Sequence, residues 1–322
     1  MSINKYIHAA AKKMGLHRKK LKEQAIRLTE KKGFPIYVIR RKHKAGFFSN
    51  FFYVLGNIVY AKEKQYSVAV DMQYYKTLYN EKKAVNGTRN AWEYYFEQPD
   101  NLSVNKALKS GNFILSSGEY PYEYVPYYVF GIKDQRNLIS RENVNRLFPY
   151  YEQYVRIKKD IIDEADKMFS RMVQKSERVL GVHFRGTDLR SAKNHPETPS
   201  LTQYDAVVSE MIRDDKYDKI LLCTDEMDIL YHFKNEYPDK VVYTDSLRSE
   251  DGTPVHKSKK RTRENDNYLK GKEVLLDALL LSRCDSIVCG HSNVAYASIL
   301  MNNNHYRKVT ILSTEDTITW TN

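Results

Sequence analysis

Residues 181–188 read GVHFRGTD and bring His183, Arg185 and Asp188 together directly after an apolar run. His183 and Arg185 are two positions apart, so their side chains are expected on one face of a strand. A guanidinium binds two phosphate oxygens at once and keeps its charge at physiological pH. The stretch therefore predicts a strand that ends at an anionic ligand. A partly buried and internally satisfied His183 is the alternative.

A second polar turn, CGHSN, follows a predicted strand and runs directly into a predicted helix. Gly290 lets the backbone approach a ligand, His291 completes the turn, and Ser292 or Asn293 is placed to cap the helix. Free N–H groups at a helix N-terminus attract phosphate. An ordinary N-cap is the alternative for this turn alone. Combined with Arg185, the turn predicts a diphosphate site with fixed positive charge and no metal.

Two acidic residues accompany these turns. Asp225 follows a predicted strand and either faces a ligand or caps the next helix. Asp277 interrupts an apolar helical run at 274–281. A buried acid requires a polar or charged partner. Asp277 is therefore expected either to contact a ligand or to pair with an internal Arg or Lys.

The elements that position these residues follow from the apolar periodicity of the second half. Five strands alternate with four helices, which is typical of a doubly wound sheet that binds ligands at the carboxyl ends of its strands. The predicted strands are 179–184, 219–223, 241–243, 286–289 and 308–312, and the predicted helices are roughly 202–214, 226–236, 271–283 and 292–302. The polar stretch 246–270 is predicted to be a long loop.

The first half shows a shorter version of the same pattern. A strand, a turn containing Gly46, a helix and a strand follow one another, which indicates a parallel sheet. These elements are predicted at 34–40, 49–62 and 66–71, with a further strand at 112–115 and a long helix at 141–174. Two α/β halves facing each other form a cleft where ligands bind. The predicted parts are an N-terminal helix at 1–32, an α/β domain at 33–140, a linking helix at 141–177 and a Rossmann-like domain at 178–322.

The composition is that of a soluble globular protein, with 322 residues of which 42% are hydrophobic and 29% charged. No apolar run approaches the roughly 18 residues of a membrane span, and the N-terminus lacks the apolar core of a signal peptide. Cys223, Cys284 and Cys289 lie near apolar runs without metal-ligand spacing, so buried free thiols in a reducing cytosol are expected. The chain has no GxGxxG, P-loop or HExxH motif, so hydride transfer and metalloprotease chemistry lack support.

The net charge of +12 is concentrated at the N-terminus. Residues 1–50 carry 14 Lys and Arg against two Glu, whereas the other 272 residues carry 38 basic and 38 acidic residues. Apolar residues recur there at helical spacing. Such a basic amphipathic helix lies on an anionic membrane, binds a nucleic-acid backbone, or packs on the protein body with its basic face in solvent. The neutral remainder argues against nucleic acid, because no basic groove extends over the body.

Three stretches of the second half resemble the motif regions of the α1,6-fucosyltransferase group, which includes nodulation-factor enzymes and animal core fucosyltransferases. They are GVHFRGTD at 181–188, LLCTDEMDILYHFKNEYP at 221–238 and KEVLLDALLLSRCDSIVCGHSNVAYASILM at 272–301. Their order and spacing match through roughly 178–302. The first half matches only in outline.

The resemblance implies a GT-B fold, in which two Rossmann-like, doubly wound domains face each other across a cleft and no metal is required. It also implies a GDP-sugar donor, typically GDP-β-L-fucose, whose sugar is transferred with inversion. By this resemblance Arg185 would bind the β-phosphate and act in catalysis, and His183 and Asp277 would contact guanine. Ser292 and Asn293 match the phosphate-binding turn.

Other residues of the first motif both match the family and depart from it. Asp188 matches a motif acid and, like Asp225, is expected to have an orienting role; Thr187 precedes it in the donor-binding stretch. The family motif reads HxRRTDK. Gly186 stands at the position of the second Arg and Leu189 at that of the Lys.

The base that deprotonates the acceptor hydroxyl is unassigned, with Asp188, Glu197 and Glu93 as candidates. The acceptor-side candidates of the first half are Gly46, Asn50, Trp92 and Glu93.

We therefore expect a metal-independent, inverting glycosyltransferase that needs no cofactor besides its GDP-sugar donor. It is expected in the cytosol, at the inner face of a membrane, acting on a glycan or lipid-linked glycan in surface-polysaccharide synthesis. One alternative is a GT-B enzyme that uses another nucleotide sugar. The other is a non-enzymatic protein that binds nucleic acid through its basic N-terminus.

Overall fold

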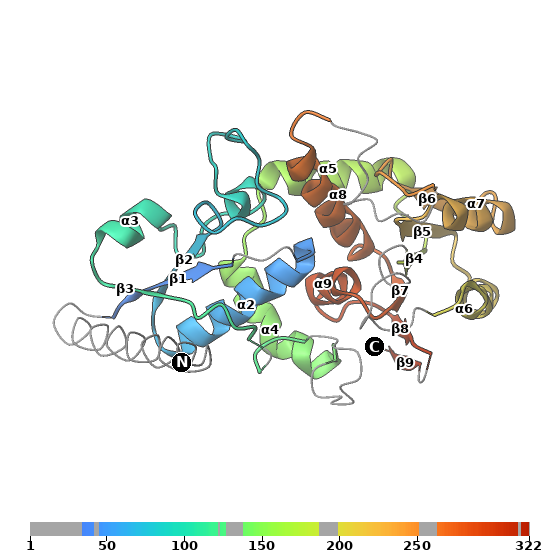
Figure 1. Ribbon diagram of the computed structural model, residues 1–322. Helices are drawn as coiled ribbons and strands as arrows, with labels where there is room; N and C mark the ends of the chain where they lie inside the picture. Colours follow the sequence, from blue (N-terminus) through green and yellow to red (C-terminus); the bar gives the residue numbers. More distant parts are fainter. Residues whose placement is uncertain are drawn as a thin grey trace, which may run out of the picture.

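The computed structural model describes residues 34–41, 45–121, 123–126, 138–186, 199–250, 263–314 and 317–321. Two separate sheets lie at opposite ends of the molecule, with long helices between them (Figure 1). The predicted N-terminal helix at 1–32 lies outside the described residues. No helix in the described ranges is long and apolar enough to cross a membrane.

The first sheet has the strand order β2-β1-β3, and all three strands are parallel. The strands are β1 (Ile36–Arg40), β2 (Ser67–Asp71) and β3 (Phe113–Leu115). The helix α2 (Phe47–Glu63) connects β1 to β2, and the short helices η1 (Ala91–Tyr94) and α3 (Val104–Lys109) follow β2. Continuous apolar runs such as YVI and VAV are typical of strands covered on both faces. The predicted β–α–β unit is confirmed.

The second sheet has the order β6-β5-β4-β7-β8-β9. Its strands are β4 (Val179–Phe184), β5 (Lys219–Thr224), β6 (Val241–Tyr243), β7 (Ser286–Gly290), β8 (Lys308–Leu312) and β9 (Ile318–Thr321). The connecting helices are α6 (Leu201–Asp215), α7 (Met227–Glu236), α8 (Asp266–Leu281) and α9 (Asn293–Asn302). From β4 the chain adds strands first on one side and then on the other, so the order reverses between β4 and β7. Open α/β sheets bind ligands at such a switch point.

The structure differs from the prediction in three places. The single helix predicted at 141–174 is two helices, α4 (Arg141–Tyr154) and α5 (Lys159–Met172). Between them the chain is extended and pairs with the first half: the N–H of Glu97 donates to the carbonyl of Arg156, and the N–H of Lys158 donates to that of Tyr95. These long-range bonds are not visible in a periodicity pattern.

The other two differences lie in the second half. The helix α8 begins at Asp266, five residues before its predicted start, so the predicted loop at 246–270 is shorter. Arg263 and Lys270 form ion pairs with Asp266 at this end and stabilise the added turn. The strand β9 was not predicted, and it pairs antiparallel with β8.

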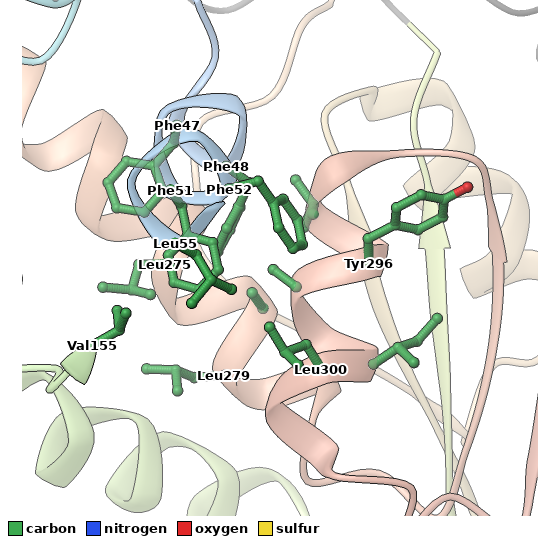
Figure 2. Packing of buried hydrophobic residues seen from close by; sticks show 14 of the residues in the cluster. Phe47, Phe48, Phe51, Phe52, Leu55, Val155, Leu275, Leu279, Tyr296 and Leu300 are labelled. Atoms are coloured by element: carbon green, nitrogen blue, oxygen red, sulfur yellow. The ribbon is translucent and has the colours of Figure 1, made fainter. Parts of the chain in front are cut away.

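One apolar core runs through both halves (Figure 2). Phe51 of α2, which is 1% exposed, packs in the same cluster as Leu275 and Leu279 of α8 and Leu300 of α9. Buried aromatic side chains contribute large apolar areas to a core. The helix α2 therefore joins the first sheet to the helices of the second. The domain boundaries proposed from the sequence stay predictions.

Candidate functional site

The switch point brings two predicted residues together. His183 lies near the end of β4, Ser292 lies two residues after the end of β7, and both residues are at least 90% buried. The Oγ of Ser292 lies 3.3 Å from Nδ1 of His183. Parallel pairing places His183 opposite Cys289, which sets this approach. The residues are 109 positions apart in the sequence.

Ser292 also caps the helix α9, as predicted. Its Oγ accepts a hydrogen bond from the N–H of Ala295 at 3.1 Å, and Asn293 is the first helical residue. Such a cap contributes about 1 kcal/mol to stability. The N-terminus of α9 therefore lies at the carboxyl edge of the sheet, where its partial positive charge favours an anion.

Gly290 packs closely against its neighbours. A Cβ at this position would lie 3.2 Å from the Tyr204 hydroxyl and 3.3 Å from Cδ of Pro199. Tyr204 is buried and donates a hydrogen bond to the carbonyl of His183 at 2.9 Å. Close packing against Tyr204 and Pro199 therefore favours a glycine here, and the approach of a ligand to its backbone stays a prediction.

His291 is buried beside the switch point, and its Nδ1 lies 2.7 Å from the Tyr296 hydroxyl. Burial lowers the pKa of His291 to about 4. The imidazole is therefore neutral at pH 7. His291 therefore contributes no positive charge to this edge, whereas Arg185 and the helix N-terminus do.

Arg185 and Gly186 follow β4, with Arg185 partly exposed. The N–H of Gly186 donates to Oδ1 of Asp225 at 3.3 Å, so the carboxylate after β5 fixes the turn that carries Arg185. The carbonyl of Asp225 accepts from the N–H of Ser249 at 2.8 Å. This geometry agrees with an orienting role for Asp225. Thr187, Asp188 and Glu197 lie outside the described residues.

Asp277 lies on α8 and is partly buried. Its Oδ1 accepts a hydrogen bond from the Thr244 hydroxyl at 3.1 Å. Burial raises the pKa of Asp277 to about 6, while Thr244 and the charge of Arg248 act in the opposite direction. No ion pair joins Asp277 to an Arg or Lys among the residues described here.

Thr244 and Arg248 lie beside Asp277, and neither was among the candidate site residues predicted from the sequence. Nη1 of Arg248 donates to the carbonyl of Ser246 at 3.0 Å, and the guanidinium lies 5.5 Å from the ring centre of Tyr243. Arg248 falls in the stretch interpreted as a loop, and its only sequence signal is that it comes a few residues after a predicted strand.

Two acceptor-side candidates have structural roles instead. Trp92 is 2% exposed, stacks on Phe96 with ring centres 4.2 Å apart, and donates its indole N–H to the carbonyl of Glu97. Glu93 accepts hydrogen bonds from side chains at 2.6, 3.2 and 2.7 Å; the donors are Thr88, Asn90 and Gln98. These bonds occupy both carboxylate oxygens, which argues against Glu93 as the catalytic base.

The other two acceptor-side candidates lie at the start of α2. Gly46 is exposed at the N-cap position. Asn50 is 5% exposed, donates to the carbonyl of Ala45 at 3.3 Å and lines a small, mainly aromatic cavity that includes Phe51 and Tyr95. The cavity volume is about 20 Å³, too small for a sugar. Asn50 therefore faces the core rather than an open acceptor surface.

The carboxyl edge of the first sheet is also polar. Arg40 donates to the Tyr75 hydroxyl at 2.7 Å, and Asp71 is 1% exposed. Oδ1 of Asp71 accepts from the N–H groups of Gln73 and Tyr74, each at 3.0 Å, and burial raises the pKa of this carboxyl. Asp71, which was not among the candidates predicted from the sequence, thus stabilises the turn after β2.

The described residues contain no group of three or more His, Cys, Asp or Glu side chains that would hold a metal ion. Metal independence stays a prediction. The three cysteines are buried free thiols, as expected.

The fold has relatives among solved structures. It is similar to the NodZ α1,6-fucosyltransferase from Bradyrhizobium, of which one crystal was soaked with GDP-fucose; the identity is 14%, 89% of this chain and 99% of that chain are covered, and the TM-score is 0.53. It is also similar to an Arg-to-Lys variant of Arabidopsis thaliana FUT1 in complex with GDP, with 11% identity, 92% and 76% coverage and a TM-score of 0.51. No protein-family model and no curated protein matches the sequence. The structural similarities confirm the predicted GT-B, fucosyltransferase-like fold.

Proposed function

We propose that this chain is a glycosyltransferase that transfers L-fucose from GDP-β-L-fucose to a hydroxyl group of a glycan, with inversion at the anomeric carbon. The observation that carries the proposal is the switch point of the second sheet. There the capped N-terminus of α9 meets His183 on one side, and the turn bearing Arg185 follows the same strand. GDP and GDP-fucose in the similar solved structures support this choice of donor.

The proposed chemistry is a single displacement. The acceptor oxygen attacks C1 of fucose from the face opposite the diphosphate, the C1–O bond to the β-phosphate breaks, and the hydroxyl proton passes to a base. Negative charge develops on the departing GDP. Preorganised cationic and N–H groups stabilise such charge. Arg185 and the N-terminus of α9 have the chemistry for this task, without a step that needs a metal.

The catalytic base is left between Asp188 and Glu197, because the carboxylate of Glu93 is occupied by three side-chain donors. Either acid would take the acceptor proton as the new glycosidic bond forms. Loss of transfer with retained GDP binding in Asp188→Asn or Glu197→Gln would identify it.

The donor site is tested by calorimetry with GDP, GMP and UDP on the wild type and on Arg185→Ala. We expect GDP to bind more tightly than UDP. A charge-assisted hydrogen bond contributes about 1.5–3 kcal/mol, so Arg185→Ala should weaken GDP binding about 10- to 100-fold. GMP lacks the β-phosphate, so Arg185→Ala should change its affinity little. The proposal fails if GDP does not bind, or if the variant binds GDP as well as the wild type does.

The sugar and the stereochemistry are tested by turnover. GDP-fucose should be consumed faster than GDP-mannose or UDP-sugars, and NMR of the product should show an α-linked fucose. A preference for another nucleotide sugar would favour the alternative donor on the same fold.

The acceptor is proposed to be a glycan or lipid-linked glycan at the cytoplasmic face of a membrane, in surface-polysaccharide synthesis. The basic charge of residues 1–50 supports this, since such segments bind anionic lipids. The full chain should co-sediment with vesicles containing phosphatidylserine, and deletion of residues 1–32 should abolish this. Unchanged sedimentation of the deletion variant would rule the proposal out. Retention of generic RNA at physiological salt would instead favour nucleic-acid binding.

A further inference from the structure

Arg248 is an arginine enclosed with most of its hydrogen-bonding capacity unused. Of its guanidinium nitrogens, Nη1 donates to the carbonyl of Ser246, while Nε and Nη2 are enclosed and have no hydrogen-bond partner among the described residues. Buried donors without partners cost free energy. Nε and Nη2 form one edge of the guanidinium, which is the edge that binds two acceptors side by side.

Arg248 is linked to Asp277 on α8 through Thr244 and Ser246. The Thr244 hydroxyl donates to Oδ1 of Asp277 at 3.1 Å and lies 2.8 Å from Oγ of Ser246, whose carbonyl accepts from Arg248. Arg248 lowers the pKa of Asp277, yet no ion pair joins the two side chains among the described residues. Three other groups act on this carboxyl. The hydroxyl of Thr244 donates to it, the thiol of Cys223 lowers its pKa, and Glu273 on the same helix raises its pKa. Glu273 is itself paired with Arg263. A carboxylate and a guanidinium thus lie near each other at the β5–β6 side of the donor edge, without neutralising one another.

This pair matches the polar edges of one nucleobase. Guanine has two adjacent donors, N1–H and the N2 amino group, and two adjacent acceptors, O6 and N7. Arginine binds O6 and N7 of guanine in a bidentate manner, and this is the commonest specific contact to guanine in DNA. A carboxylate accepts from N1–H and the N2 amino group.

We infer that Arg248 is a specificity-determining residue of the donor site, which binds O6 and N7 of guanine while Asp277 accepts from its N1–H and N2 amino group. The inference rests on the proposed function, because it assumes a GDP-sugar at this edge. Among the described residues, the guanidinium makes one hydrogen bond, to the carbonyl of Ser246, and lies 5.5 Å from the ring centre of Tyr243. Rotation about the last side-chain torsions of Arg248 would present the edge formed by Nε and Nη2 to the base.

The arrangement selects against other bases. Adenine places an amino donor where guanine has O6 and an acceptor at N1, so both charged side chains would face groups of the wrong polarity. Uracil has no imidazole ring and offers the guanidinium no second acceptor.

The decisive probes are GDP, 7-deaza-GDP, which lacks the N7 acceptor, and IDP, which lacks the N2 amino group. Calorimetry compares them on the wild type, Arg248→Met and Arg248→Lys. In the wild type we expect 7-deaza-GDP to bind about tenfold or more weakly than GDP. In Arg248→Met this difference should vanish. IDP should bind more weakly than GDP in both proteins, because Asp277, which accepts from the N2 amino group, is intact. Arg248→Lys retains the charge but not the fork, so it should also lose most of the discrimination at N7.

The outcomes separate the two proposals. If GDP does not bind the wild type, the proposed function fails and this inference fails with it. If GDP binds but the discrimination at N7 is absent, or persists in a folded Arg248→Met, only the role of Arg248 is overturned. If Arg248→Met weakens GDP, 7-deaza-GDP and IDP by one common factor, Arg248 acts through the fold or the charge of Asp277, and direct recognition is excluded. Thermal melts of each variant check folding.

Discussion

At the scale of single residues, Asp277 is a group of the candidate site whose pKa is raised toward neutral pH. Burial raises the pKa of Asp277 to about 6, whereas in an unfolded chain this carboxyl releases its proton near its ordinary pKa of 3.8. The native state therefore holds the proton between about pH 4 and 6, so this residue favours the folded state at low pH. That contribution is lost as the pH rises through 6. Burial lowers the pKa of His291 to about 4, so its imidazole is mostly neutral above pH 5.

The first prediction is a pH dependence of GDP binding. The carboxylate form of Asp277 accepts from guanine, so GDP affinity should rise between pH 5 and 7. The phosphate of GDP also titrates near pH 6. Asp277→Asn is therefore the matched control: calorimetry should show weaker binding with a smaller rise over the same range. Parallel profiles for the two proteins would exclude Asp277 from base recognition.

At the scale of elements, helix ends determine how the site is assembled. The start of α8 lies against the first half, where the Tyr95 hydroxyl donates to the carbonyl of Tyr268 at 2.9 Å. Gly271 leaves room for this tyrosine: a Cβ there would contact its hydroxyl and lie 2.7 Å from its Cζ. Because Tyr95 is 1% exposed, it has little space to move. The same helix carries Asp277, so its docking positions the base-binding carboxylate.

The second prediction concerns this docking. Gly271→Ala should destabilise the protein by about 1–3 kcal/mol, since an added methyl group would force apart two packed elements. Gly46→Ala is the control, because no atom lies within 4 Å of a Cβ at that position. Thermal unfolding should show a clear loss for Gly271→Ala and a small change for Gly46→Ala. Equal midpoints for the two variants would contradict the close packing at Gly271.

At the scale of the whole molecule, the two sheets share one core. Residues of β1 and β2, including Ile39 and Val70, belong to the same apolar cluster as Ile287 of β7 and Ile311 of β8. The helices α2, α8 and α9 form the middle of this cluster (Figure 2). A core without a break couples the stability of its parts, so both halves are expected to unfold together.

The third prediction tests this coupling with the two tryptophans. In Trp320→Phe the remaining Trp92 reports on the first half, and far-UV circular dichroism reports on the whole chain. Both probes should give one denaturation midpoint. Phe51→Ala should lower the midpoint seen by both probes, by an amount equivalent to about 3–5 kcal/mol. Phe34 is 65% exposed, so Phe34→Ala should change the midpoint little. A shift confined to Trp92 fluorescence would indicate two independent domains.

Much of the fold was predictable because its signals are local. The parallel strands are short apolar runs bounded by turn residues, and Ser292 follows such a run at the start of a helix. The break between α4 and α5 was not predictable, because Arg156 and Lys158 leave the helix to bond with Glu97 and Tyr95, about 60 residues earlier in the chain. The contacts of Trp92 and Glu93 were not predictable for a related reason: a polar or aromatic motif does not reveal that neighbouring residues pack against it or donate hydrogen bonds to it.

The sequence by itself determined which residues follow each strand, since strands and turns depend on neighbouring side chains. Only the tertiary structure decided which of those residues meet. The order β6-β5-β4-β7 places His183 beside Ser292, and the path of the chain after β6 brings Arg248 near Asp277. The proximity of each pair depends on long-range packing of the helices between the sheets. A local sequence pattern does not encode such contacts.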